Sequence, residues 1–173
     1  AVMTARALGD RVPALALTDA RVAEGIATAR WPARLQRLTE GPLVAACGAG
    51  TELWLDGGHN EAAAAVIAGQ LDAWAEPRTA VIVGMLESKE PVAFFRKLAG
   101  RVAAVKTIAI PEEKATLSAE AVAEKAGEAG LAADPCSDIG SALQALLDAP
   151  EPPRRVLICG SLYLAGAVLR ENG

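Results

Sequence analysis

The sequence predicts an α/β fold in which a mostly parallel sheet is flanked by helices on both faces. Strand-like and helix-like segments alternate with short connections from Asn60 to Arg170, an order typical of parallel sheets with helical crossovers. The composition agrees, because 52% of the 173 residues are hydrophobic while only 3% are aromatic. A core built from Ala, Val, Leu and Ile suits a sheet that is buried on both faces.

The first thirty residues differ from the rest and are expected to be helical. Thr18 and Asp19 are expected to begin a helix that continues through Ile26, because Thr and Asp are favoured helix caps. Trp31-Pro32 ends this helix, since proline disfavours helix in the residue before it. Beyond it, alternation and turn residues predict three short strands, over residues 34–38, 43–47 and 52–56.

A strand–helix rhythm then follows. Pro91 is compatible with the first turn of a helix, and Ser118 and Gly130 are expected to cap and end the next one. Strands are predicted over residues 79–85, 102–110 and 155–159, with a weak strand at 131–133, and helices over 60–74, 89–98, 118–129, 139–147 and 161–170.

Charge and composition exclude several classes of protein. The net charge of −4 and pI of about 5.1 argue against a nucleic-acid surface, which needs clustered Lys and Arg. No apolar run approaches the roughly 20 residues of a membrane span. The three cysteines, Cys47, Cys136 and Cys159, are far apart and lack metal-ligand spacing. We therefore expect reduced thiols in a cytoplasmic protein, with no nucleic-acid or membrane partner and no metal site in this chain.

Three strand-to-helix turns should meet at the carboxyl edge of the predicted sheet, where open α/β sheets bind ligands. The turn at residues 56–60 offers the Asp56 carboxylate for ribose hydroxyls and His59, the one histidine, for phosphate. The turn at 84–89 offers the cation Lys89, and the turn at 159–162 offers the Ser161 hydroxyl and free helix-start amides. Together these groups predict an anion or nucleotide site.

Each residue also has a simpler interpretation that the sequence leaves open. Asp56 is equally compatible with a helix cap, and Ser161 with an N-cap alone. Lys89 is compatible with a solvated surface lysine, and Arg34 with a partner for any surface acid. The chain has no Gly-x-x-x-x-Gly-Lys-Ser/Thr loop and no Gly-x-Gly-x-x-Gly turn. The phosphates of a bound nucleotide would therefore be held largely by groups outside this chain.

Four motifs follow one another along the chain: Trp31-Pro32-Ala33-Arg34-Leu35-Gln36, Leu55-Asp56-Gly57-Gly58-His59-Asn60, Val83-Gly84-Met85-Leu86 with Lys89, and Leu157-Ile158-Cys159-Gly160-Ser161-Leu162-Tyr163-Leu164-Ala165-Gly166. Together they resemble the C-terminal domain of the folylpolyglutamate synthase/dihydrofolate synthase family, within the Mur-ligase superfamily. The resemblance implies a Rossmann-like sheet of the Mur-ligase C-terminal domain type. Two residues depart from the family pattern, Ala33 for glycine and Glu61 for proline.

The resemblance also implies a function. The family uses ATP to activate a carboxylate as an acyl phosphate, which the amine of L-glutamate attacks, and the acceptor is dihydropteroate or a folate. By resemblance, Arg34 reaches the ATP phosphates, Asp56 holds the ribose and His59 lines the nucleotide pocket. Arg34 and His59 are thus the expected catalytic residues. Lys89 and Ser161 match positions that hold the carboxylates of the incoming amino acid.

The resemblance further implies a second domain. Residues 1–30 are expected to end an N-terminal ATPase domain that carries the phosphate loop and the Mg²⁺ ligands, and residues 31–173 to form the C-terminal domain. We expect a hinge near residues 30–34, a monomer, and no ligation by this chain alone. A stand-alone nucleotide-binding or regulatory module, and a Mur-type ligase acting on another carboxylate acceptor, remain alternatives. A Rossmann oxidoreductase is disfavoured because no glycine-rich dinucleotide turn is present.

Overall fold

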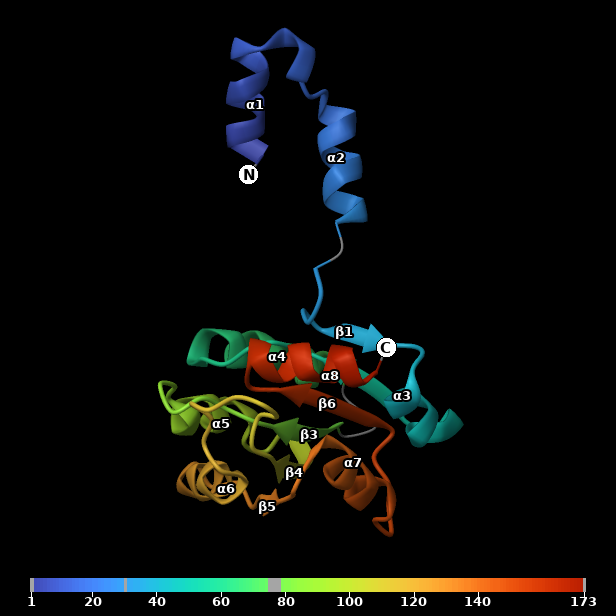
Figure 1. The fold of residues 1–173 in the computed structure, drawn as a ribbon, viewed down its shortest axis with the longest axis vertical. Helices are drawn as coiled ribbons and strands as arrows, with labels where there is room; N and C mark the ends of the chain where they lie inside the picture. The colour runs from blue at the N-terminus through green and yellow to red at the C-terminus, as the bar shows by residue number, and fades with distance from the viewer. Residues whose placement is uncertain (1, 30, 75–78, 173) are drawn as a thin grey trace. The chain divides into compact units, whose positions relative to one another are not determined.

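A mostly parallel sheet forms the centre of residues 33–173 (Figure 1). The computed structural model describes residues 2–29, 31–74 and 79–172. Its strands have the spatial order β1-β2-β6-β3-β4-β5. They are β1 (Gln36–Leu38), β2 (Glu52–Leu55), β3 (Thr79–Val83), β4 (Val102–Thr107), β5 (Asp134–Pro135) and β6 (Arg155–Cys159). Only the β1–β2 pair is antiparallel among the described strand pairs, so the predicted sheet is confirmed with β1 as its antiparallel edge.

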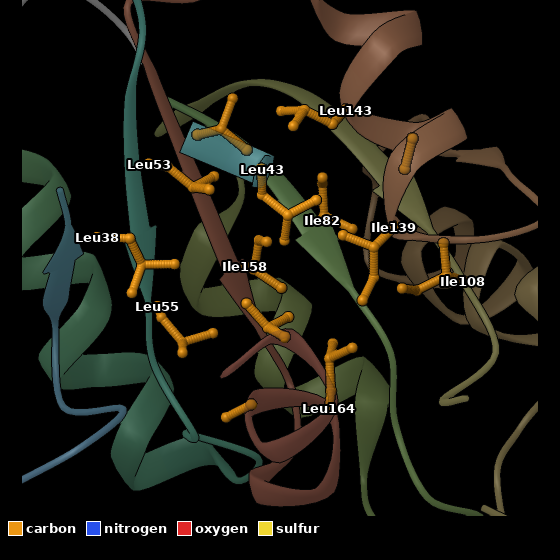
Figure 2. Packing of buried hydrophobic residues seen from close by; sticks show 14 of the residues in the cluster. Leu38, Leu43, Leu53, Leu55, Ile82, Ile108, Ile139, Leu143, Ile158 and Leu164 are labelled. Atoms are coloured by element: carbon orange, nitrogen blue, oxygen red, sulfur yellow. The ribbon is translucent and has the colours of Figure 1, made fainter. Parts of the chain in front are cut away.

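Helices cover both faces of this sheet, as the composition predicted. Successive residues of β3 alternate between two cores, with Ile82 in the first and Val83 in the second, because neighbouring strand residues point to opposite faces. Figure 2 shows part of the first core, where Ile82 and Ile158 lie among leucines from strands and helices. Over the first core lie α3 (Pro42–Cys47), α7 (Ile139–Leu147) and α8 (Leu162–Glu171), and over the second α4 (Glu61–Trp74), α5 (Pro91–Leu98) and α6 (Ala119–Glu128).

Residues 1–32 form a separate compact unit. It contains α1 (Val2–Arg11), a 3₁₀ turn (Pro13–Leu15) and α2 (Asp19–Thr28), which Thr18 caps by accepting a hydrogen bond from the Arg21 amide. The predicted helical character and the Thr18 cap are confirmed. Gly9 is the one buried residue among those described in this unit, so the two helices enclose no core of their own.

One predicted strand is wrong. Residues 43–47 belong to the helix α3, because Pro42 occupies the first helical position after a turn at Gly41. Leu43 and Cys47 are its buried residues, and Ala45 between them is exposed. This pattern fits one face of a helix and not a strand, in which Ala45 would share their face. The Asn172 side chain supports this helix start, since its Oδ1 accepts from the Leu43 amide at 3.0 Å.

Other elements are confirmed with shifted ends. The strand expected over residues 34–38 begins only at Gln36, and the helix expected from residue 89 begins at Pro91. β3 stops at Val83 and β4 at Thr107, and the weak strand lies at Asp134–Pro135 rather than at residues 131–133. Asn60 precedes α4 and caps it, because its Oδ1 accepts from the Ala63 amide at 2.9 Å.

The three cysteines are free thiols. Burial raises the pKa of Cys47 and of Cys159, and for Cys159 the nearby Asp56 carboxylate adds to this effect. Burial likewise raises the pKa of Cys136. All three thiols therefore stay protonated near neutral pH and are poor nucleophiles. None of the helices described here has the length and apolar character needed to cross a membrane.

Candidate functional site

The three predicted turns lie at one edge of the sheet. They follow β2, β6 and β3, which are parallel neighbours in that order. Backbone hydrogen bonds tie them together: the Gly160 amide donates to the Gly58 carbonyl at 2.9 Å, and the Gly84 amide donates to the Cys159 carbonyl at 3.3 Å. The sequence-based expectation of a shared carboxyl edge is therefore confirmed.

Gly160 makes this close approach possible. Its φ is 109°, and a Cβ there would stand 2.6 Å from the Gly84 carbonyl oxygen. We expect Gly160→Ala to destabilise the fold by more than about 2 kcal/mol, because backbone strain and a backbone clash add. Gly69→Ala is the matched control, since nothing lies near that position on α4, and should stabilise by about 0.5–1 kcal/mol. Equal urea unfolding midpoints for the two variants would contradict this account.

Asp56 is held by the backbone rather than by the helix that follows it. The carboxylate is 7% exposed. Its Oδ2 accepts from the Leu35 amide at 2.8 Å, and its Oδ1 accepts from the Gly58 amide at 2.7 Å. The interpretation of Asp56 as the cap of α4 is thus not supported, because Asn60 has that role. Each carboxylate oxygen still has capacity to accept a further hydrogen bond.

Arg34 does not lie on a strand as predicted, but in a turn just before β1. The residues on either side of it, Ala33 and Leu35, have φ of 54° and 43°. This left-handed conformation costs roughly 1–2 kcal/mol for a residue with a Cβ. Arg34 Nη1 donates to the Ala33 carbonyl at 2.9 Å. The departure from glycine at Ala33 is therefore significant, since this position does require a positive φ.

His59 is the third polar side chain at this turn. Its Nδ1 lies 3.0 Å from the Gly57 carbonyl oxygen, so Nδ1 carries the proton in this contact and donates it. The neutral ring then presents Nε2 as an acceptor, and the protonated ring presents a second donor. No hydrogen-bond partner of Nε2 is found within residues 2–29, 31–74 and 79–172.

Arg34, Asp56 and His59 line one pocket of about 280 Å³. The rest of its wall comes from the Gly57-Gly58 turn and the first turns of α4, through Asn60, Ala63, Val66 and Ile67. The sequence reasoning missed the α4 wall. Its signal was present in the spacing of Ala63 and Ile67, which puts them on one face of a helix. Val66 is 67% exposed and gives the pocket an apolar side.

Lys89 and Ser161 lie at the same edge but outside this pocket. Ser161 is 3% exposed, and its Oγ accepts from the Tyr163 amide at 3.1 Å, so the N-cap interpretation is confirmed. Lys89 is half-buried in the turn before α5. In the part of the chain that the structure describes, its Nζ forms no ion pair.

Glu61, the second departure from the family pattern, is the first residue of α4. Its Oε1 pairs with Lys97 Nζ of α5 at 3.0 Å. The pair links the start of α4 to α5, and the lysine offsets the negative charge. Glu61 is absent from the residues that line the pocket.

A larger cavity of about 470 Å³ lies at the opposite edge, at the start of β2 and β6. Three arginines and one acid line it: Arg154 forms no ion pair among the described residues, and Glu52 pairs with Arg37 at 3.2 Å and with Arg155 at 3.1 Å. The hydrogen bond from Trp54 and these two arginines hold the pKa of Glu52 below its usual range. We place the candidate chemistry at the smaller pocket because it lies at the carboxyl edge of the sheet, where open α/β sheets bind ligands, and because Arg34 and His59 have no acidic partner there among the described residues.

Within the described residues, no cluster of three His, Cys, Asp or Glu side chains could hold a metal ion. The pocket itself offers one carboxylate and one imidazole. A divalent cation at this edge would need ligands from a bound nucleotide or from another domain.

Comparison with known proteins decides the family. The Mur ligase, glutamate ligase domain matches residues 34–162, which include the sheet and all three turns. The chain belongs to this family. The match also includes Arg34, Asp56, His59, Lys89 and Ser161. The fold is thus that of a glutamate ligase domain, and the resemblance drawn from the four motifs is confirmed at the level of the family.

Individual relatives of this glutamate ligase domain agree. The chain is 30% identical over 153 residues to a folylpolyglutamate synthase from Lacticaseibacillus casei, covering 88% of this chain and 32% of that protein. A bifunctional folylpolyglutamate synthase/dihydrofolate synthase solved with Mn, AMPPNP and L-glutamate bound matches with a TM-score of 0.70 and 28% identity, over 89% of this chain and 34% of that one.

A folylpolyglutamate synthase from Mycobacterium tuberculosis, solved with ADP and AMPPCP, matches with a TM-score of 0.74 and 22% identity. That match covers 91% of this chain and 36% of the other, and it supports the fold alone. The chain spans about a third of the length of the relatives that it matches.

Proposed function

We propose that this glutamate ligase domain belongs to an ATP-dependent ligase that adds L-glutamate to dihydropteroate or to a folate. The observation that carries the proposal is that Arg34, Asp56 and His59 line one pocket at the carboxyl edge of the sheet. The relative solved with AMPPNP, Mn and L-glutamate supports a nucleotide and an amino acid as ligands.

The pocket residues suit a nucleotide. Asp56 retains acceptor capacity for a ribose hydroxyl while both of its oxygens hold backbone amides. Arg34 offers a guanidinium that carries no acidic partner among the described residues, and such a group pairs well with phosphate oxygens. His59 Nε2 can donate to phosphate when the ring is protonated. Ala63 and Val66 supply an apolar wall beside these polar groups.

Arg34 would act on the transferred phosphoryl group. The γ-phosphoryl of ATP passes to the acceptor carboxylate, which gives ADP and an acyl phosphate. The amine of glutamate then attacks the acyl carbon, so that an amide forms and phosphate leaves. A fixed guanidinium stabilises the charge that develops on the phosphoryl oxygens. We assign His59 to the same part of the pocket.

Lys89 and Ser161 are proposed to hold the incoming glutamate. The Lys89 cation and the amides at the start of α8 are at the edge where a dianionic amino acid would approach. The two residues lie in the turns after β3 and β6, which are adjacent strands. They are separate from the nucleotide pocket, so both ligands can be present together.

The remaining parts of the reaction are proposed to come from an N-terminal ATPase domain, with residues 1–30 as its end. The few buried residues of this segment are in keeping with helices that pack on another domain. That domain would supply the phosphate loop and the Mg²⁺ ligands, and closure about residues 31–34 would bring Arg34 onto ATP; Arg30, the first residue of the expected hinge, lies outside the described residues. We propose a monomeric cytoplasmic enzyme in which this chain alone is inactive.

ADP release tests the proposed function directly. The protein carrying both domains is incubated with ATP, Mg²⁺ and dihydropteroate, with or without L-glutamate, and folates replace dihydropteroate in parallel. Glutamate-dependent release is the expected result. Release with another carboxylate acceptor only would favour a different Mur-type ligase. Nucleotide binding without turnover on any acceptor would favour a regulatory module. Turnover by residues 1–173 alone would contradict the two-domain requirement.

A further inference from the structure

The residues on either side of Arg34 have an unfavourable backbone conformation that something must maintain. These residues, Ala33 and Leu35, both have positive φ although neither is glycine. Such a conformation persists only where surrounding contacts impose it, and it is found where a side chain has to be aimed. The segment is also short, because β1 begins at Gln36.

Three contacts hold this turn. The Leu35 amide donates to Asp56 Oδ2 at 2.8 Å, and the Gly57 amide donates to the Ala33 carbonyl at 2.9 Å. The third contact comes from a side chain without an assigned role: Gln36 Oε1 accepts from the Ala33 amide at 2.9 Å. The Gln36 side chain thereby bonds to the backbone three residues before it and takes the place of a backbone acceptor in the turn.

The same turn fixes the guanidinium. Arg34 Nη1 donates to the Ala33 carbonyl at 2.9 Å and lies 3.0 Å from the position that a Cβ of Gly57 would occupy. The Ala33 carbonyl therefore accepts hydrogen bonds from Arg34 and Gly57, and the Ala33 amide donates one to Gln36. Gln36 does not line the nucleotide pocket and instead borders a different cavity, beside Leu169 and Asn172.

We propose that Gln36 is a positioning residue that aims Arg34 at the nucleotide. It acts through the Ala33 turn and touches neither ligand. The proposal rests on the proposed function, because it takes Arg34 as the group that meets phosphate. Without the Gln36 acceptor, the Ala33 amide loses its partner and Ala33 can relax from positive φ, which moves the guanidinium away from its fixed place.

A pair of variants separates the acceptor from the size of the side chain. Gln36→Met keeps the length and removes the acceptor, whereas Gln36→Glu keeps an oxygen acceptor. We expect Gln36→Met to lower kcat/KM for ATP by roughly ten- to a hundredfold, as misplacement of a catalytic group does, and Gln36→Glu to restore most of it. Gln144→Met, on the exposed face of α7, is the matched control and should leave kcat/KM unchanged.

Coupling to Arg34 distinguishes positioning from a general loss of structure. In an Arg34→Ala background, Gln36→Met should cause no further loss of kcat/KM. Hydrogen exchange of the Ala33 amide gives a second readout that does not depend on turnover, and it should speed up in Gln36→Met and not in Gln36→Glu. The proposal is overturned if Gln36→Met causes the same loss of kcat/KM with and without Arg34. It is also overturned if Gln36→Met is fully active while Arg34→Ala is impaired.

The proposed function fails by a different result. If the unaltered protein releases no ADP with any acceptor, the ligase assignment fails. The Ala33 exchange rates would then still report whether Gln36 holds the turn. If the unaltered protein is active and Arg34→Ala is equally active, Arg34 does not meet phosphate, and positioning by Gln36 fails with it.

Discussion

Arg34→Ala is expected to lower kcat for ATP-dependent glutamate addition by roughly 10²- to 10³-fold, as does the loss of one fixed donor to a developing oxyanion. The reason is the geometry of the turn, which holds the guanidinium over Gly57 beside Asp56 and His59. Steady-state kinetics of the two-domain protein, with ATP and L-glutamate varied separately, measure the effect.

The controls for Arg34 separate charge from geometry. Arg34→Lys keeps the charge but lacks the planar pair of donors, so it should recover only part of the rate. Arg96→Ala, on the exposed surface of α5, removes an arginine from a position outside the pocket and should leave kcat unchanged. A kcat for Arg34→Ala within twofold of the unaltered protein would remove Arg34 from the chemistry.

Asp56→Ala is expected to affect stability and nucleotide binding together. The buried carboxylate accepts from the Leu35 and Gly58 amides, so alanine would leave two donors without a partner. We expect a loss of about 2–6 kcal/mol in the free energy of unfolding, because each unpaired donor usually costs about 1–3 kcal/mol. Urea unfolding of the 173-residue chain measures this, with Asp72→Ala, a surface acid on α4, as the control.

The ribose contact of Asp56 needs a separate experiment, because an unfolded variant binds nothing. Asp56→Asn keeps the shape and one oxygen acceptor. In the unaltered protein, 2′,3′-dideoxy-ATP should bind roughly tenfold more weakly than ATP, the effect of losing one hydrogen bond to a charged group. In Asp56→Asn this preference for ATP should become smaller, because a neutral amide oxygen replaces the charged acceptor. If the preference for ATP is the same in both proteins, Asp56 acts on the fold only.

The core and the order of elements were predictable from the sequence because local patterns carry them. Continuous aliphatic runs gave β3 and β6, and the caps at Ser118 and Ser161 gave the helix starts. The segment at 43–47 was not predictable in this way, because a short apolar run has no period of its own. Its helix starts at Pro42 and is supported by Asn172, a residue 129 positions beyond Leu43 whose contact the local pattern does not indicate.

For the candidate site, too, the residue types were predictable and their arrangement was not. Its chemistry could be predicted, since Asp56, His59, Lys89 and Ser161 all follow strands that end at one edge. The strand pattern alone did not indicate which of these share a pocket, and only the resemblance separated Arg34, Asp56 and His59 from Lys89 and Ser161; the pocket contains the first three and not the last two. Whether a residue lines this pocket depends on which turns the sheet places next to each other, and that depends on the pairing of strands.

The α/β order, the family and the residue types at the ligand-binding edge can be predicted from the sequence, because they follow from periodicity, caps and motifs within short stretches. The orientation of those residues depends on contacts between distant segments. Ala33 and Leu35 adopt positive φ against their own preference, because Gln36 accepts a hydrogen bond from the Ala33 amide and the distant Asp56 accepts one from the Leu35 amide. A conformation that depends on a partner 21 residues away cannot be encoded in the local pattern around Arg34.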